Sequence, residues 1–157
     1  MQNLAENLDE HELMQEALAN FAALLDDLDF ATELEMLGIG RLQFLRRKQM
    51  LIELRGLYTA LWRLALGRSF PNDADAMFQT FMQRYVDSHA GKSSGQIVER
   101  AQQYWGMLEP AGDADFSKVS SHLASFVERG QKELPPLVLG LALHIRSAYR
   151  LIFDRLI

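Results

Sequence analysis

The chain contains no cysteine, and this absence excludes disulfide bonds and thiolate chemistry. Proline is also scarce, with four residues in 157. Together with an apolar fraction of 48%, this composition is typical of a globular protein and not of a disordered one. A chain of this length is the usual size of one domain, so we expect a single domain that spans residues 1–157.

Motifs for catalysis and for nucleotide or metal binding are missing as well. The chain has no G-x-x-x-x-G-K-[ST], no G-x-G-x-x-G and no G-x-S-x-G, and its one Gly-Lys-Ser, at 91–93, lacks the preceding glycine and strand. None of the four histidines follows an acidic residue by three positions, and the stretch from His11 fails the H-E-x-x-H pattern at Gln15. We therefore predict no catalytic residue, no metal site and no cofactor. The alternative is a Mg²⁺ or Ca²⁺ site at three carboxylates on one helical face, Asp26, Asp29 and Glu33.

Apolar residues recur at helical spacing along the chain, and no stretch alternates in the manner of a strand. This pattern predicts an all-α fold, a single-domain bundle of about six helices, with a short additional helix near 29–37. One helix is long, from about 41 to 67, and the last, from about 136 to 157, is apolar. The first helix is predicted to start at a capping box formed by Asp9 and Glu12.

The last helix raises the question of a membrane span. Its uncharged run, 134–145, is twelve residues long, whereas a span needs about 20. We expect a buried helix, with His144 as a hydrogen-bonded core residue, and no membrane insertion. Because its first half has no polar face, the bundle or a second subunit should cover it on every side, with Ile152 and Phe153 at the interface. The N-terminus lacks the basic and apolar parts of a secretory signal, which favours a cytoplasmic location.

Charge is distributed unevenly along the chain. Residues 1–40 contain ten acids and no lysine or arginine, whereas 41–68 contain seven bases and only Glu53 as an acid. At about 100° per residue, four of these bases share one sector of the long helix, and two apolar residues lie on the same side. The six are Arg41, Lys48, Arg55 and Arg63, with Leu45 and Ile52. We expect the acidic arm, 1–40, to pack on this basic stripe, within one chain or between two; the alternative is that the stripe binds an external anion.

The stretch LEMLGIGRLQFL, 34–45, resembles the middle of a helix-turn-helix over about twenty residues, 29–48. An apolar residue precedes Gly38 and Ile39, and a helix rich in arginine and glutamine follows. The resemblance implies DNA binding, with base and phosphate contacts from Arg41, Gln43, Arg46 and Arg47. The stretch departs from the pattern in having Leu34 where a small residue is usual, Arg47 where an apolar one is, and a much longer second helix. The acidic arm and a pI near 5.3 also disfavour a nucleic-acid partner.

These patterns predict a non-enzymatic protein–protein interaction or regulatory protein that forms a homodimer. Its contact surfaces would be the last helix and the basic stripe. The predicted interface or anion-binding residues are Arg41, Lys48, Arg55, Arg63, Leu45, Ile52, Ile152 and Phe153. Two alternatives remain open: a small-molecule-binding domain with an aromatic-lined pocket, and a DNA-binding regulator.

Overall fold

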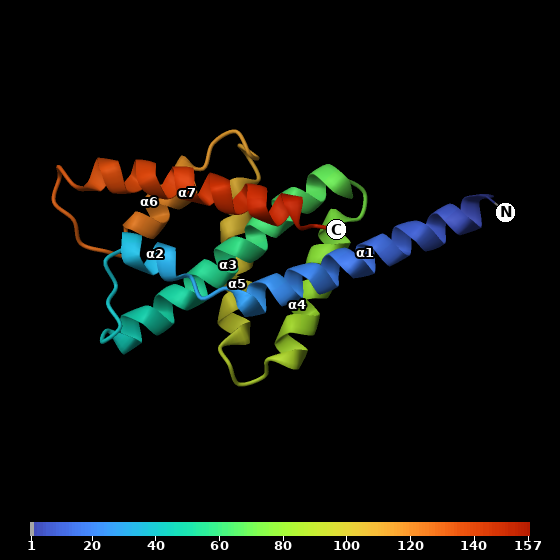
Figure 1. The fold of residues 1–157 in the computed structure, drawn as a ribbon, viewed down its shortest axis with the longest axis horizontal. Coiled ribbons are helices and arrows are strands. Elements are labelled where there is room, and N and C mark those ends of the chain that lie inside the picture. Colours follow the sequence, from blue (N-terminus) through green and yellow to red (C-terminus); the bar gives the residue numbers. More distant parts are fainter. Residues whose placement is uncertain (1) are drawn as a thin grey trace.

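The computed structural model describes residues 2–157, with side chains from Asp9 onward, and this part of the chain is helical and contains no strand (Figure 1). The predicted all-α bundle is therefore confirmed, including the short additional helix. The seven helices are α1 (Gln2–Asp27), α2 (Ala31–Met36), α3 (Phe44–Ser69), α4 (Ala74–Ser88), α5 (Ser94–Leu108), α6 (Ser117–Ala124) and α7 (Leu134–Asp154).

Helix α3 is the centre of the bundle, and α1, α4, α5 and α7 all contact it. Its middle and second half are almost entirely buried, from Glu53 to Leu66, because neighbours cover more than one of its faces. Helix α5 crosses α3 closely at Gly56. A Cβ atom there would lie 2.5 Å from the Cβ of Arg100 and 3.1 Å from the backbone nitrogen of Ala101. Glycine at this position therefore lets the two helix backbones approach closely.

The second half of α1 packs on α3 and α4 through aromatic side chains. The Phe21 ring stacks on Trp62 with centroids 4.8 Å apart, and Phe81 meets Phe21 edge-on at 5.0 Å. Asp9 to Leu13 lie before this contact along α1 and are all exposed. Figure 1 shows this part of the helix extending beyond the rest of the molecule.

Two predicted helix starts differ from the structure. Helix α1 runs through Asp9 and Glu12, so the predicted capping box is wrong. Leucine, alanine and glutamate in the preceding residues favour continuation of the helix. Helix α3 begins at Phe44, which leaves Arg41 in the preceding loop instead of on the helix. In that loop the Gln43 side chain accepts a hydrogen bond from the backbone N–H of Gly40 at 2.9 Å.

Helix α7 packs on α6 and α3 through one face only. Ile145 and Ile152, on this face, are 2% and 1% exposed. On the opposite face Leu139 and Leu143 are 63% and 57% exposed, so the prediction that this helix is covered on every side is wrong for the single chain. By length and composition α7 is the one helix in residues 2–157 that is long and apolar enough to cross a membrane, although part of it is core.

Candidate functional site

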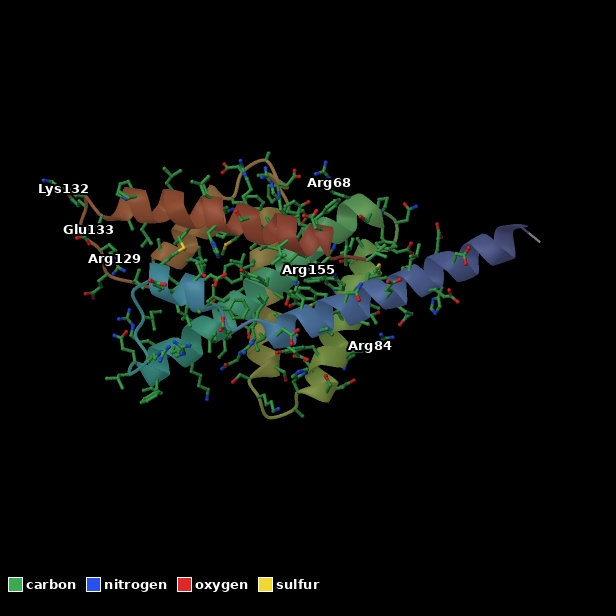
Figure 2. All side chains as sticks on the ribbon, viewed as in Figure 1. Arg68, Arg84, Arg129, Lys132, Glu133 and Arg155 are labelled. Carbon is green, nitrogen blue, oxygen red and sulfur yellow. The ribbon has the colours of Figure 1, made fainter. Side chains whose placement is uncertain are left out.

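The N-terminal end of α3 exposes an unusual combination of side chains, which we call the α3 tip and define as residues 41–48. Three large apolar residues here, Leu42, Phe44 and Leu45, are 86%, 71% and 78% exposed. The other residues are Gln43 and four bases, with no acid. Figure 2 shows side chains projecting from this end of α3 away from the other helices. The α3 tip is therefore an apolar knob with a basic surround.

Beside the α3 tip lies a groove of about 290 Å³, the basic groove, between the first half of α3 and the loop before α5. Four basic residues line it and no acidic residue does: Arg47, Lys48, Arg55 and Lys92. Phe44 and Ile52 supply apolar wall. At this groove α5 begins without a side-chain cap, after Ser93 at a φ of 61°. The uncapped N-terminal N–H groups of α5 add to the positive potential of the basic groove.

A second groove of about 370 Å³, the mixed groove, lies on the other side of Ile52. Its apolar walls come from Ile39, Met50 and Phe126. The Arg46 guanidinium also lines it and donates a hydrogen bond to the Phe126 carbonyl at 3.2 Å. Phe126 is 41% exposed, because α6 ends at Ala124 and the chain turns before reaching it.

The wall of the mixed groove contains a buried ion pair. Glu53 on α3 is only 7% exposed, and it accepts hydrogen bonds from the Arg100 Nε at 2.8 Å and from the Tyr104 hydroxyl at 2.7 Å. Burial and the adjacent carboxylate raise the pKa of Tyr104, which therefore stays protonated and donates. Since both oxygens of Glu53 have partners, the pair joins α3 to α5 and fixes the position of Arg100 in the groove wall.

A second buried carboxylate, Glu33, joins α2 to α3 and α7. It accepts a hydrogen bond from the Tyr58 hydroxyl and lies 2.8 Å from the Nε2 of His144. Burial raises the pKa of Glu33, but its hydrogen bonds with His144 and Tyr58 outweigh this and lower it overall. The same contact with Glu33 raises the pKa of His144. The prediction of His144 as a hydrogen-bonded residue is confirmed, and the pair is a helix-to-helix contact rather than part of either groove.

Sequence reasoning missed the buried role of both glutamates. It placed Glu33 with Asp26 and Asp29 on one helical face, but Asp29 lies between α1 and α2, outside any helix. Both aspartates are exposed while Glu33 is buried. No group of three metal-ligating side chains occurs among the described residues. The signal that pointed toward Glu33 was His144 itself, since a histidine in an apolar run needs a polar partner.

The predicted basic stripe is divided by the fold. Lys48 and Arg55 line the basic groove, with Ile52 half-buried beside them. Arg63 lies farther along α3, where its guanidinium covers the Trp105 ring at 4.3 Å from the centroid and its Nε is 3.9 Å from Asp75. The stripe is therefore not one continuous surface.

From Asp9 onward, the acidic arm forms no ion pair with these bases inside one chain. Where side chains are described, its ion-pair contacts join Glu33 to His144 and Asp26 to His89. At the other predicted interface, Phe153 is 39% exposed, but Ile152 is part of the core and is unavailable to a partner. Within one chain, α7 turns the side that carries Ile152 toward the bundle.

The structure of residues 29–48 departs further from a helix-turn-helix than the sequence does. Seven residues, 37–43, separate α2 from α3, whereas the motif joins its helices by a turn of about three or four. The first turn of α3 presents Phe44 and Leu45 to solvent, where a recognition helix carries groups that read bases. Comparison of the chain with protein-family models, characterised proteins and solved structures found no match.

Proposed function

We propose that this chain is a non-enzymatic interaction protein that docks an acidic, amphipathic protein helix on the α3 tip and the basic groove. The observation that carries the proposal is the exposure of Leu42, Phe44 and Leu45 among bases without any acid. Exposed apolar residues are common singly, but three within four positions form a patch of the kind that partners cover.

Burial of this knob would supply much of the binding free energy. Covering a large apolar side chain contributes about 1.5–3 kcal/mol relative to leaving it exposed, and the fold uses none of the three in its core. The bases around the knob would contribute mainly orientation, association rate and partner choice. This division matches the anatomy of transient interfaces, in which an apolar centre is surrounded by a polar rim.

The grooves on either side of Ile52 suit a helical partner. A helix lying across the first half of α3 would place apolar side chains against Phe44 and Ile52 and acidic ones over the basic groove. Lys48, Arg55 and Lys92 have no acidic partner among the described residues, so a docked carboxylate would not compete with an internal ion pair. Helix-in-groove recognition of this kind is common among binding proteins.

A direct test is fluorescence anisotropy with a labelled, designed 20-residue helix that carries leucines on one face and glutamates on the other. Phe44→Ser/Leu45→Ser should weaken binding at least tenfold, and added salt should weaken binding to the wild type. The matched control is Leu139→Ser/Leu143→Ser, which removes two leucines of α7 that are 63% and 57% exposed and should bind as the wild type does. Equal loss in both variants, or no loss at the α3 tip, would contradict the proposed docking surface.

A second candidate function is the binding of a small organic molecule in the mixed groove. Its volume of about 370 Å³ is within the range of ligand pockets, about 300–1,000 Å³. Apolar walls at Ile39 and Phe126 combine there with the fixed guanidinium of Arg100. Native mass spectrometry of the purified protein tests this candidate: a retained mass that is lost in Ile39→Trp would support it, and an unmodified chain mass would count against it.

A further inference from the structure

We propose that the acidic helix docked on the α3 tip is the first half of α1 from a second copy of this chain. The inference rests on the docking role proposed for the α3 tip and names its partner. We call the first half of α1, residues 2–16, the arm; it is a shorter segment than the acidic arm, 1–40. It is about 22 Å long at 1.5 Å per residue. Its described acids, Asp9, Glu10, Glu12 and Glu16, are all exposed.

Where its side chains are described, from Asp9 to Glu16, most of the arm is exposed. A helix of about 15 residues is only marginally stable in water without tertiary contacts. Met14 is the first described side chain of α1 to pack on the core, and Ala17 is the first to be fully buried. Contact with a second copy would cover the side chains from Asp9 to Leu13, which are exposed in the single chain.

The arm also matches the α3 tip in pattern. Leu13 is 37% exposed, and at about 100° per residue Asp9, Glu10 and Glu16 fall within about 60° of it around the helix. An apolar residue surrounded by acids thus faces outward on the arm, and apolar residues surrounded by bases face outward on the α3 tip. Complementary fields of this kind select a partner and its orientation.

The two surfaces cannot meet within one chain. Figure 1 shows the N-terminal end of α1 and the start of α3 at opposite ends of the long axis of the molecule. A two-fold axis would place the arm of each copy on the α3 tip of the other. Two equivalent contacts then form at once, and the assembly closes as a dimer.

Charge reversal on both surfaces tests the pairing in the full chain, with mass measured by sedimentation velocity. The arm variant is Glu10→Lys/Glu12→Lys/Glu16→Lys, and the tip variant is Arg41→Glu/Arg46→Glu/Lys48→Glu; all six positions are exposed, so the fold should tolerate both changes. We expect a dimeric wild type, monomers for each variant alone, and a dimer again when the two variants are mixed. A mixture restores both contacts, because the basic arm of one variant meets the acidic tip of the other.

The control is Lys118→Glu/Lys132→Glu/Arg150→Glu, which reverses three exposed charges elsewhere and should remain dimeric. Lys132, for example, lies in the loop before α7 (Figure 2). Circular dichroism confirms that each variant is folded. A monomeric wild type, a dimer that survives both variants, or a mixture that stays monomeric would each overturn the pairing. If the designed acidic helix still binds the α3 tip in those cases, only the identity of the partner is refuted; if it does not bind, the proposed docking role fails as well.

Discussion

The Nε2 of His144 lies 2.8 Å from the Glu33 carboxylate, which joins the last helix to the second across 111 positions of sequence. The contact raises the pKa of His144 above its ordinary value of 6.5. Glu33 has a pKa below its ordinary value of 4.5, because its hydrogen bonds outweigh the effect of burial. The ion pair thus contributes to folding stability only where both groups are charged.

This pair should make stability depend on pH. The contribution of His144 is fully present below pH 6.5 and is lost as the pH rises through its raised folded pKa. The contribution of Glu33 is present above pH 4.5 and is lost as the pH falls through its lowered folded pKa. Urea unfolding between pH 5.5 and 8.5 should show stability falling toward the alkaline end, and His144→Gln should flatten that slope. An unchanged slope in the variant would show that other groups cause it.

Tyr58→Phe should destabilise the protein by about 1–3 kcal/mol, because it leaves a buried carboxylate without one donor. Tyr149→Phe is the matched control. Burial raises the pKa of the Tyr149 hydroxyl, and nearby Arg68 acts to lower it. No protein group in the described structure forms a hydrogen bond with this hydroxyl. The control should therefore be neutral or slightly stabilising in urea unfolding. Equal destabilisation by both substitutions would refute a specific role for the Tyr58 hydroxyl.

Gly56→Ala should cost about 1–3 kcal/mol of stability by overpacking the α3–α5 crossing, where the new Cβ would lie 2.5 Å from that of Arg100. Gly106→Ala provides the comparison, since a Cβ at this α5 position meets nothing within 4 Å. That change should stabilise by about 0.5–1 kcal/mol through helix propensity alone. Thermal unfolding measures both, and the same sign of change in the two variants would argue against a tight crossing at Gly56.

Two neighbouring residues on α7 should behave differently. Ile152→Ala should cost about 2–5 kcal/mol, because Ile152 is 1% exposed and its loss leaves a cavity. Phe153→Ala should cost less, since Phe153 is 39% exposed. Neither change should alter the subunit count measured by sedimentation if the α3 tip is the interface. Dissociation of a dimer by Phe153→Ala, with the fold intact, would instead locate the interface on α7.

Local features of this chain were readable from its sequence. The bounds of α7, Leu134–Asp154, lie within three residues of the predicted bounds, about 136–157, because apolar spacing acts over a few residues. The all-α class follows from the same local periodicity. His144 could be expected to have a polar partner for an equally local reason, since it interrupts an apolar run.

Which side of each helix is covered depends on contacts between distant segments. Periodicity is a property of neighbours along the helix, whereas burial depends on where helices cross, as α3 and α5 do at Gly56. Leu139 looked like core in the sequence and is exposed, while Ile152 looked available and is core. The burial of Glu33 and Glu53 likewise depends on distant segments. Tyr58 and His144 supply the hydrogen-bond partners of Glu33, and Arg100 and Tyr104 supply those of Glu53. The amino-acid pattern thus determined the helices and the uneven charge, whereas the packing of α3 against its neighbours determined which apolar and basic residues remain exposed.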